Sequence, residues 1–153
     1  MKIHFVREQM EDEESIKISY VKDSEILKRL KRYAEELNKE YSKIELYQDD
    51  TQYYMEVDKI LFFETEDNKI LAHTKDDVYS VTYRLYELEQ LLPGQFIRVS
   101  KSTILNAKHI YSVEKNVTSS SCVEFNNTHK TVYVSRRYYK ELKNKLQEVR
   151  RLV

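Results

Sequence analysis

The sequence contains a single cysteine, Cys122, and it has no tryptophan. One cysteine cannot form an internal disulfide, and so sparse a use of cysteine is typical of a reducing compartment. No apolar stretch approaches the roughly 18 residues that a membrane-spanning helix needs, and no signal-peptide hydrophobic region is present. We therefore expect a cytoplasmic protein. The chain is long enough for one domain with its own core and a small appendage.

Glycine and proline are almost as scarce, since Pro93 and Gly94 are the only ones in the chain. With one glycine, the chain cannot form the glycine-rich loops that hold phosphates by close backbone approach. Turns that need a positive φ must use asparagine or aspartate instead. Candidate turns of this kind are Asp49-Asp50, Asp67-Asn68, Asp76-Asp77 and Asn126-Asn127.

The residue types that catalysis needs are present but scattered. The four histidines follow no metal-ligand spacing; they are His4, His73, His109 and His129. Residues 11–14 form an acidic run that could hold a cation, although such a run is more often a solvated loop. Cys122 has no basic neighbour in the sequence that would lower its pKa, which favours a small core residue. We predict no enzyme activity, no catalytic residue, no cofactor, no metal site and no small-molecule substrate.

The net charge of zero hides a strong asymmetry along the chain. Residues 44–93 carry 4 basic and 12 acidic side chains, and residues 94–153 carry 12 basic and 4 acidic ones. A field of net +8 in the last 60 residues favours an anionic partner there. The two halves could equally be complementary to each other, so the charge counts only together with motifs.

Alternating apolar residues predict that nearly everything from residue 43 to 134 is β. The exception is an amphipathic helix from Tyr83 to Leu92, which Pro93 stops. The run from Lys59 to Glu64 is apolar enough to predict a strand buried on both faces. The expected strands are 43–47, 52–57, 59–64, 69–74, 78–81, 96–99, 109–114, 119–125 and 131–134. Residues 104–106 should return to the core and close with a turn former.

The two ends of the chain add helices to this β scaffold. Residues 2–7 and 16–21 alternate as strands, and a helix capped by Asp23 or Ser24 should reach about Lys39. This ββα unit, residues 1–43, is too short for a core of its own, which suggests dimerisation or regulation. At the other end, Ser135 should cap a basic helix to about Leu152, with a wide apolar stripe. That stripe argues against a major-groove reader of the helix-turn-helix type.

Cations and amides gather at three strand ends. They are Asn68-Lys69, Ser100-Lys101-Ser102 and Arg136-Arg137. Cationic and hydroxyl donors at strand ends can meet nucleic-acid phosphates, although such ends are often merely solvated.

Four segments resemble the LytTR-type DNA-binding domain of bacterial transcription regulators. They are Asp58-Lys-Ile-Leu-Phe-Phe-Glu64, Tyr86-Glu-Leu-Glu-Gln-Leu-Leu-Pro93, Phe96-Ile-Arg-Val-Ser-Lys-Ser-Thr-Ile-Leu-Asn106 and Val134-Ser-Arg-Arg-Tyr-Tyr139. The resemblance covers roughly residues 44–150. It implies a mainly β fold with some α: an elongated LytTR-like β-sheet domain over residues 44–153 with a C-terminal helix, whose loops enter successive major grooves of duplex DNA. Residues 1–43 would be the small ββα unit that precedes it, and they are too short for a receiver domain.

The resemblance also implies roles for individual residues. Base contacts fall on Asn68, Lys101 and Arg137, which suit adenine and guanine edges. Lys69, Ser100, Ser102 and Arg136 become candidates for DNA backbone contacts, although many members carry histidine where Ser100 stands. Arg98 is either a further contact or a structural residue paired with a carboxylate, and Asn106 is expected to be a turn or cap.

The family further implies paired direct repeats in the DNA, with two protein copies per promoter, and in some members a membrane-protein inhibitor. The sequence leaves a homodimer open, with residues 1–43 as the expected place for it. The alternative is a non-catalytic protein-interaction module that uses the N-terminal unit and the C-terminal helix while the basic residues are only solvated.

Overall fold

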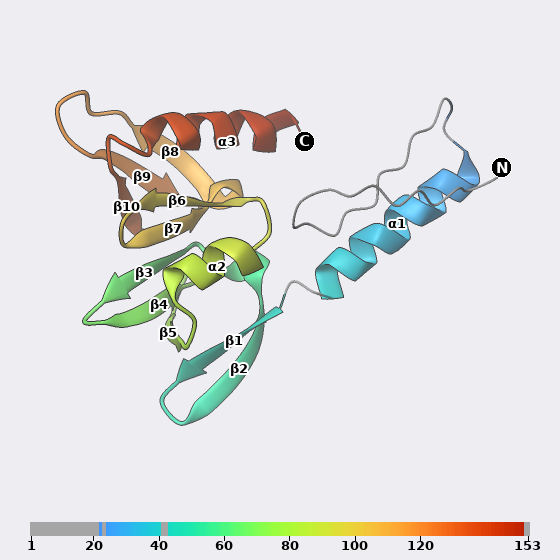
Figure 1. Ribbon diagram of the computed structural model, residues 1–153, viewed down its shortest axis with the longest axis horizontal. Helices are drawn as coiled ribbons and strands as arrows, with labels where there is room; N and C mark the ends of the chain where they lie inside the picture. Colours follow the sequence, from blue (N-terminus) through green and yellow to red (C-terminus); the bar gives the residue numbers. More distant parts are fainter. Residues whose placement is uncertain (1–21, 23, 41–42, 152–153) are drawn as a thin grey trace. The chain divides into compact units, whose positions relative to one another are not determined.

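The computed structural model describes residues 22, 24–40 and 43–151 (Figure 1). The strands expected at 2–7 and 16–21 lie outside the described residues. The chain divides into two compact units, residues 1–35 and residues 36–153. In the first unit, the N–H of Leu27 donates to the hydroxyl of Ser24 at 3.2 Å, so Ser24 caps helix α1 (Glu25–Glu40). Leu27 is buried, whereas Ile26 and Tyr33 are exposed.

Seven antiparallel strands form the larger sheet of the second unit, in the order β2-β1-β5-β4-β3-β7-β6 (Figure 1). They are β1 (Lys43–Gln48), β2 (Thr51–Glu56), β3 (Phe62–Glu66), β4 (Lys69–His73), β5 (Val78–Val81), β6 (Phe96–Ser100) and β7 (Thr103–Asn106). The 3-10 turn η1 (Val57–Lys59) precedes β3, where a longer strand was expected. Helix α2 (Leu85–Leu91) lies between β5 and β6 in the chain.

Three antiparallel strands form the smaller sheet, in the order β10-β9-β8. They are β8 (Ile110–Glu114), β9 (Ser121–Phe125) and β10 (Thr131–Val134). The 3-10 turn η2 (Ala107–His109) leads from β7 into β8, and helix α3 (Tyr139–Arg151) follows β10. The mainly β fold with a C-terminal helix, predicted from the sequence, is therefore confirmed.

Strands β3 and β7 stand between two hydrophobic cores. Because side chains of a strand alternate between the faces of a sheet, Phe63 and Ile104 pack with Leu88 of helix α2 in one core. Phe62 and Leu105 face the other core, with Leu142 of helix α3. All six side chains are at most 3% exposed. The expected burial of the Lys59–Glu64 run on both faces is thus confirmed for its apolar residues.

Asparagine and aspartate occupy the turns that glycine would usually fill. Positive φ angles occur at Asp49, Asp67, Asn68 and Asn127, as the scarcity of glycine predicted. Asn106 is fully buried: its Nδ2 donates to the carbonyl of Ile60 at 3.1 Å, and its Oδ1 accepts the N–H of Lys108 at 3.2 Å. It is the cap that the sequence predicted, at the start of η2.

The C-terminal helix begins later than predicted. Helix α3 starts at Tyr139, so Ser135 is not its cap. The backbone of Ser135 is used instead: its N–H donates to the carbonyl of Val99 at 2.9 Å, and its carbonyl accepts the N–H of Tyr138 at 3.0 Å. Ser135 has the local pattern of a helix cap, but its N–H is used in a hydrogen bond to Val99, which lies 36 positions earlier in the chain.

Candidate nucleic-acid interface

The turn between β3 and β4 presents Asn68. Asp67 and Asn68 have φ angles of 46° and 63°, and both are exposed. Two consecutive positive φ angles are typical of the tight turns whose twist matches antiparallel strands. Lys69, the first residue of β4, is also exposed and pairs in register with Glu66. The amide and the ammonium of this turn therefore face solvent.

The turn between β6 and β7 presents Lys101 and Ser102. Both are exposed, whereas Ser100 is half-buried. The Ser100 hydroxyl accepts the N–H of Ser102 at 3.2 Å and lies 3.3 Å from the Ser102 hydroxyl. The carbonyl of Ser102 accepts the N–H of Thr65 at 2.8 Å, which ties this turn to β3.

The Arg98 side chain holds the backbone of that turn through hydrogen bonds. Its Nε donates to the Ser100 carbonyl at 2.7 Å, its Nη2 donates to the Lys101 carbonyl, and its Nη1 lies 2.8 Å from Oε1 of Glu89. Of the two readings that the sequence left open, the structure shows the one in which Arg98 pairs with a carboxylate. An arginine fork with all three nitrogens engaged fixes the two carbonyls that flank the Lys101 side chain.

Arg136 and Arg137 lie in the turn that follows β10, and both are exposed. The guanidinium carbon of Arg137 is 5.9 Å from the ring centroid of Tyr138, within the range of a cation–π contact. This turn is attached to β6 through the hydrogen bond from Ser135 to Val99. The pairing of β6 with β7 is irregular between Arg98 and Ser100. Such a bulge leaves Val99 out of the ladder and frees its carbonyl for Ser135.

The three turns lie at one end of the two sheets, on the left of Figure 1. The register explains why: Glu64 pairs with Thr103, so the β3–β4 turn and the β6–β7 turn emerge side by side. The Ser135–Val99 bond then places the β10–α3 turn beside the end of β6. Asn68, Lys101 and Arg137, which are far apart in sequence, are thereby brought to neighbouring turns of one edge.

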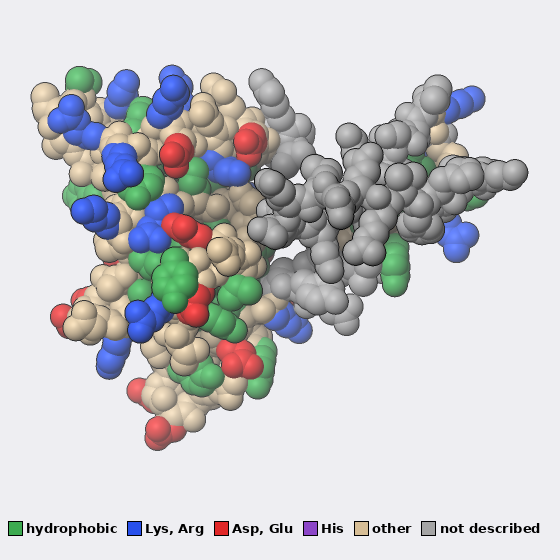
Figure 2. Space-filling view, viewed as in Figure 1, with side chains coloured by type: hydrophobic (Ala, Val, Ile, Leu, Met, Phe, Trp, Pro, Cys, Tyr) green, Lys and Arg blue, Asp and Glu red, His purple; other side chains and the backbone are tan. Residues whose placement is uncertain are grey.

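Basic and acidic side chains gather at different parts of the second unit. Figure 2 shows Lys and Arg side chains gathered on the part of this face that β8–β10 and helix α3 form, and acidic side chains at the far hairpin. That hairpin joins β1 to β2 through Asp49 and Asp50. Lys130 belongs to the opposite end of the small sheet, where its Nζ donates to the carbonyls of Thr74 at 2.8 Å and Asp77 at 2.9 Å. Burial lowers the pKa of this ammonium group.

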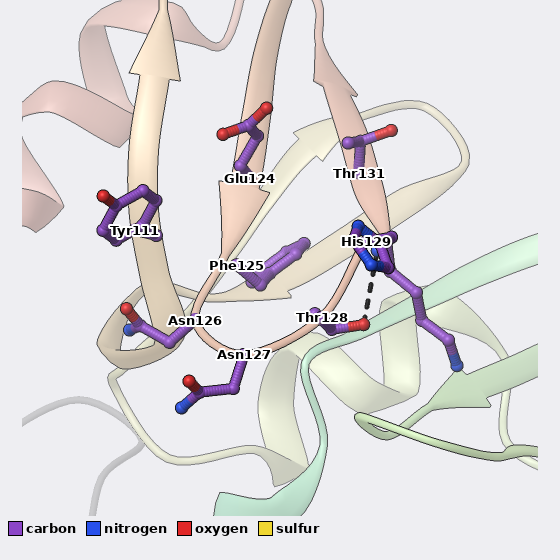
Figure 3. Close-up of a pocket in the computed structure, with 9 residues that line it drawn as sticks. Tyr111, Glu124, Phe125, Asn126, Asn127, Thr128, His129 and Thr131 are labelled. Carbon is purple, nitrogen blue, oxygen red and sulfur yellow. Dashed lines mark hydrogen bonds between the residues drawn. The ribbon is translucent and has the colours of Figure 1, made fainter.

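The turn between β9 and β10 borders an open cavity of about 570 Å³ (Figure 3). Its lining comes from β8, β9, β10 and that turn, and includes Tyr111, Glu124 and His129. Because Val134 pairs with Ser121, this turn lies at the opposite end of the sheet from Arg137. The cavity is therefore separate from the three candidate turns.

Metal ligands and the cysteine thiol are the candidates for chemistry other than binding. In residues 22, 24–40 and 43–151, no group of three or more His, Cys, Asp or Glu side chains could hold a metal ion. Burial raises the pKa of the Cys122 thiol, which disfavours the reactive thiolate. Among the described helices, none is long and apolar enough to cross a membrane.

Comparison with known proteins identifies the scaffold. The family of LytTr DNA-binding domains (LytTR) matches residues 50–147. The chain belongs to this family. The LytTR match includes all three candidate turns and agrees with the prediction of a non-catalytic, DNA-binding protein.

Relatives of this LytTR protein extend the similarity beyond the domain. An uncharacterized HTH-type transcriptional regulator of Staphylococcus aureus strain MSSA476 is 29% identical over 146 residues, which cover 95% of this chain and 98% of the relative. A protein of the same description from strain NCTC 8325 is 33% identical over 100 residues, which cover 65% of this chain and 67% of the relative.

A solved LytTR structure has the same fold. It is the LytTr DNA-binding domain of a protein described as a methyl-accepting/DNA response regulator from Bacillus cereus, with a TM-score of 0.64 and 27% identity. The match covers 69% of this chain and 96% of that one. Although the Staphylococcus relatives are named HTH-type, every two successive α-helices in the described part of this chain are separated by strands.

The sequence prediction missed one loop at the candidate edge. Residues 115–120 connect β8 to β9 there, and Ser119 and Ser120 were expected in a strand that in fact begins at Ser121. The signal that was available is composition: the loop contains one lysine, one asparagine, one threonine and two serines in six residues.

Proposed function

We propose that this protein is a bacterial transcription regulator that binds duplex DNA sequence-specifically through three turns of its LytTR scaffold. Asn68, Lys101 and Arg137 would contact bases in the major groove. Lysine and arginine suit the O6 and N7 acceptors of guanine, and asparagine suits the N6 and N7 of adenine. The convergence of these three exposed side chains on one edge is the observation that carries the proposal.

Four neighbouring residues would contact the sugar-phosphate backbone. Lys69 and Arg136 would supply charge from exposed positions, and Ser102 an exposed hydroxyl. Ser100 is half-buried and its hydroxyl is engaged with Ser102, so its contact would depend on the same turn. Phosphate contacts fix the orientation of the protein on the duplex, and base contacts set the sequence preference.

Selection from a random duplex library would first define the preferred site, which then serves in anisotropy titrations. Lys101→Ala and Arg137→Ala should each weaken specific binding by roughly 1–3 kcal/mol without unfolding the protein. Affinity should fall with salt with a log–log slope near −0.9 for each neutralised phosphate.

Lys108→Ala is the matched control. Lys108 is exposed and lies in η2, beyond the end of β7 that is remote from Lys101. It should bind like the wild type. If both Lys101→Ala and Arg137→Ala also bind the selected site like the wild type, this face does not bind the DNA. If no sequence is enriched even at low salt, the protein-interaction module becomes the better description.

The resemblance supports further features of the same function. We propose that operators carry paired direct repeats occupied by two copies of the protein. Residues 1–43 would serve dimerisation or regulation, and residues 44–153 would bind DNA. The protein would act in the cytoplasm, where a membrane protein would hold it inactive. Analytical ultracentrifugation of the full chain and of a variant without residues 1–43 tests the dimer. If residues 1–43 mediate dimerisation, the shorter chain should no longer associate.

A further inference from the structure

The loop between β8 and β9, residues 115–120, continues the line of the three candidate turns. Glu114 pairs with Cys122, and Ser121 pairs with Val134, the residue just before the Ser135–Arg137 turn. The loop therefore leaves the small sheet at the same edge as Arg136 and Arg137. Since β9 and β8 lie beyond β10 in the sheet order, the loop flanks these arginines on the side away from Lys101.

Internal hydrogen bonds hold the loop in shape. The Oδ1 of Asn116 accepts both the N–H and the hydroxyl of Thr118, each at 3.1 Å. The N–H of Asn116 donates to the hydroxyl of Ser121 at 3.1 Å. Asn116 and Thr118 are thus committed to the loop itself. A pre-organised loop loses little conformational freedom when it binds a partner.

Other donors of the loop face solvent. Lys115, Ser119 and Ser120 are exposed. The ammonium of Lys115 lies 5.2 Å from the ring centroid of Tyr139, the first residue of helix α3, which steadies a cation that would otherwise sample many rotamers. Lysine and serine side chains are among the usual donors to phosphate oxygens in protein–DNA complexes.

We infer that residues 115–120 form a fourth DNA contact, in which Lys115, Ser119 and Ser120 bind backbone phosphates flanking the segment that Arg137 reads. The inference rests on the proposed function. The short side chains of the two serines favour contact with the outer phosphates rather than with base edges deep in a groove. The loop lengthens the footprint and adds affinity that does not depend on sequence.

The test compares the affinities of Lys115→Ala and the wild type for the selected operator and for two shortened operators. Each shortened operator lacks about six base pairs, roughly half a helical turn, at one of its two ends. On the full duplex, loss of one phosphate contact should make the log–log salt slope shallower by about 0.9. Between 50 and 200 mM salt, the affinity advantage of the wild type should therefore shrink by about 3.5-fold. On the duplex that lacks the contacted flank, the two proteins should bind alike.

Three further proteins make the outcome decisive. Lys115→Arg should keep the salt slope because it keeps the cation, Ser119→Ala/Ser120→Ala should weaken binding to the full duplex only, and Lys108→Ala should change nothing. The fourth contact is overturned if Lys115→Ala weakens binding equally on all duplexes. It is also overturned if Lys115→Ala weakens binding on none of them while Arg137→Ala still does. If Arg137→Ala and Lys101→Ala also bind normally, it is the proposed function itself that fails.

Discussion

Arg98 and Glu89 form an ion pair, with 2.8 Å between Nη1 and Oε1, that joins strand β6 to helix α2. The same guanidinium holds the carbonyls of Ser100 and Lys101. The acidic helix α2 thus supports the turn that carries Lys101. A planar arginine fork can serve these acceptors together, whereas a lysine ammonium is a point charge on a flexible stem.

Removing the Arg98–Glu89 ion pair should reduce the sequence specificity of DNA binding and leave its charge-dependent part unchanged. In Glu89→Gln the ion pair is lost but the DNA-facing cations remain. We expect the preference for the operator over a scrambled duplex to fall by up to about tenfold, about 1.4 kcal/mol. The salt slope should not change, because the number of phosphate contacts is the same.

Competition binding with the two duplexes measures this effect, and Glu141→Gln on the exposed side of helix α3 is the control. An unchanged preference in Glu89→Gln would show that the turn keeps its shape without the ion pair.

Asn68 can be tested without disturbing its turn. Its φ of 63° would strain an alanine, but glycine adopts such a value freely. Asn68→Gly should therefore remove the amide and cost roughly 1–3 kcal/mol of specific binding while non-specific binding stays constant. Asn127→Gly is matched, because Asn127 has a φ of 59° in the β9–β10 turn at the opposite end. If Asn127→Gly weakens operator binding as much as Asn68→Gly, the amide of Asn68 contacts no base.

Asn106 should contribute stability and not recognition. Replacing it by leucine removes the hydrogen bonds to Ile60 and Lys108 in a fully buried site. Leaving the Ile60 carbonyl without its partner should lower the free energy of unfolding by roughly 1–3 kcal/mol. Urea denaturation of Asn106→Leu and of the wild type gives this difference directly. A variant as stable as the wild type would show that water replaces the amide.

His73 should make stability depend on pH. Burial lowers its pKa, which outweighs the opposing effect of Glu64, 2.7 Å away through Nε2. The ring also stacks on Phe62, with 4.2 Å between centroids. Because the folded pKa lies below the unfolded value of 6.5, the unfolded chain binds the proton more tightly. Stability is therefore retained above pH 6.5 and lost as the pH falls below it.

The matched variants separate His73 from other acid effects. Urea midpoints at pH 7.5 and 5.5 should differ less in His73→Gln than in the wild type, whereas the exposed His129→Gln should behave like the wild type. An equal pH dependence in wild type and His73→Gln would rule out His73 as the source.

Local chemistry accounts for the parts of this protein that were predicted well. The apolar alternation of residues 43–134 indicated strands, and with only one glycine the positive φ angles had to fall on Asp and Asn. The wide stripe of the C-terminal helix indicated a buried helix, and Leu142 is indeed 1% exposed. Even the two roles weighed for Arg98 followed from its neighbours, since a cation beside a strand end can meet either phosphate or carboxylate.

The sequence by itself determined most of the strands and the turns made by Asp and Asn, because backbone propensity and hydrophobic period act over a few neighbouring positions. Only the tertiary structure decided which turns meet. The register between β3 and β7, the bulge at Val99 and the bond from Ser135 to Val99 bring the three turns together. The β3–β7 register joins residues 39 to 43 positions apart, and the Ser135–Val99 bond joins residues 36 positions apart. No local pattern encodes them, since they depend on the packing of two cores around β3 and β7.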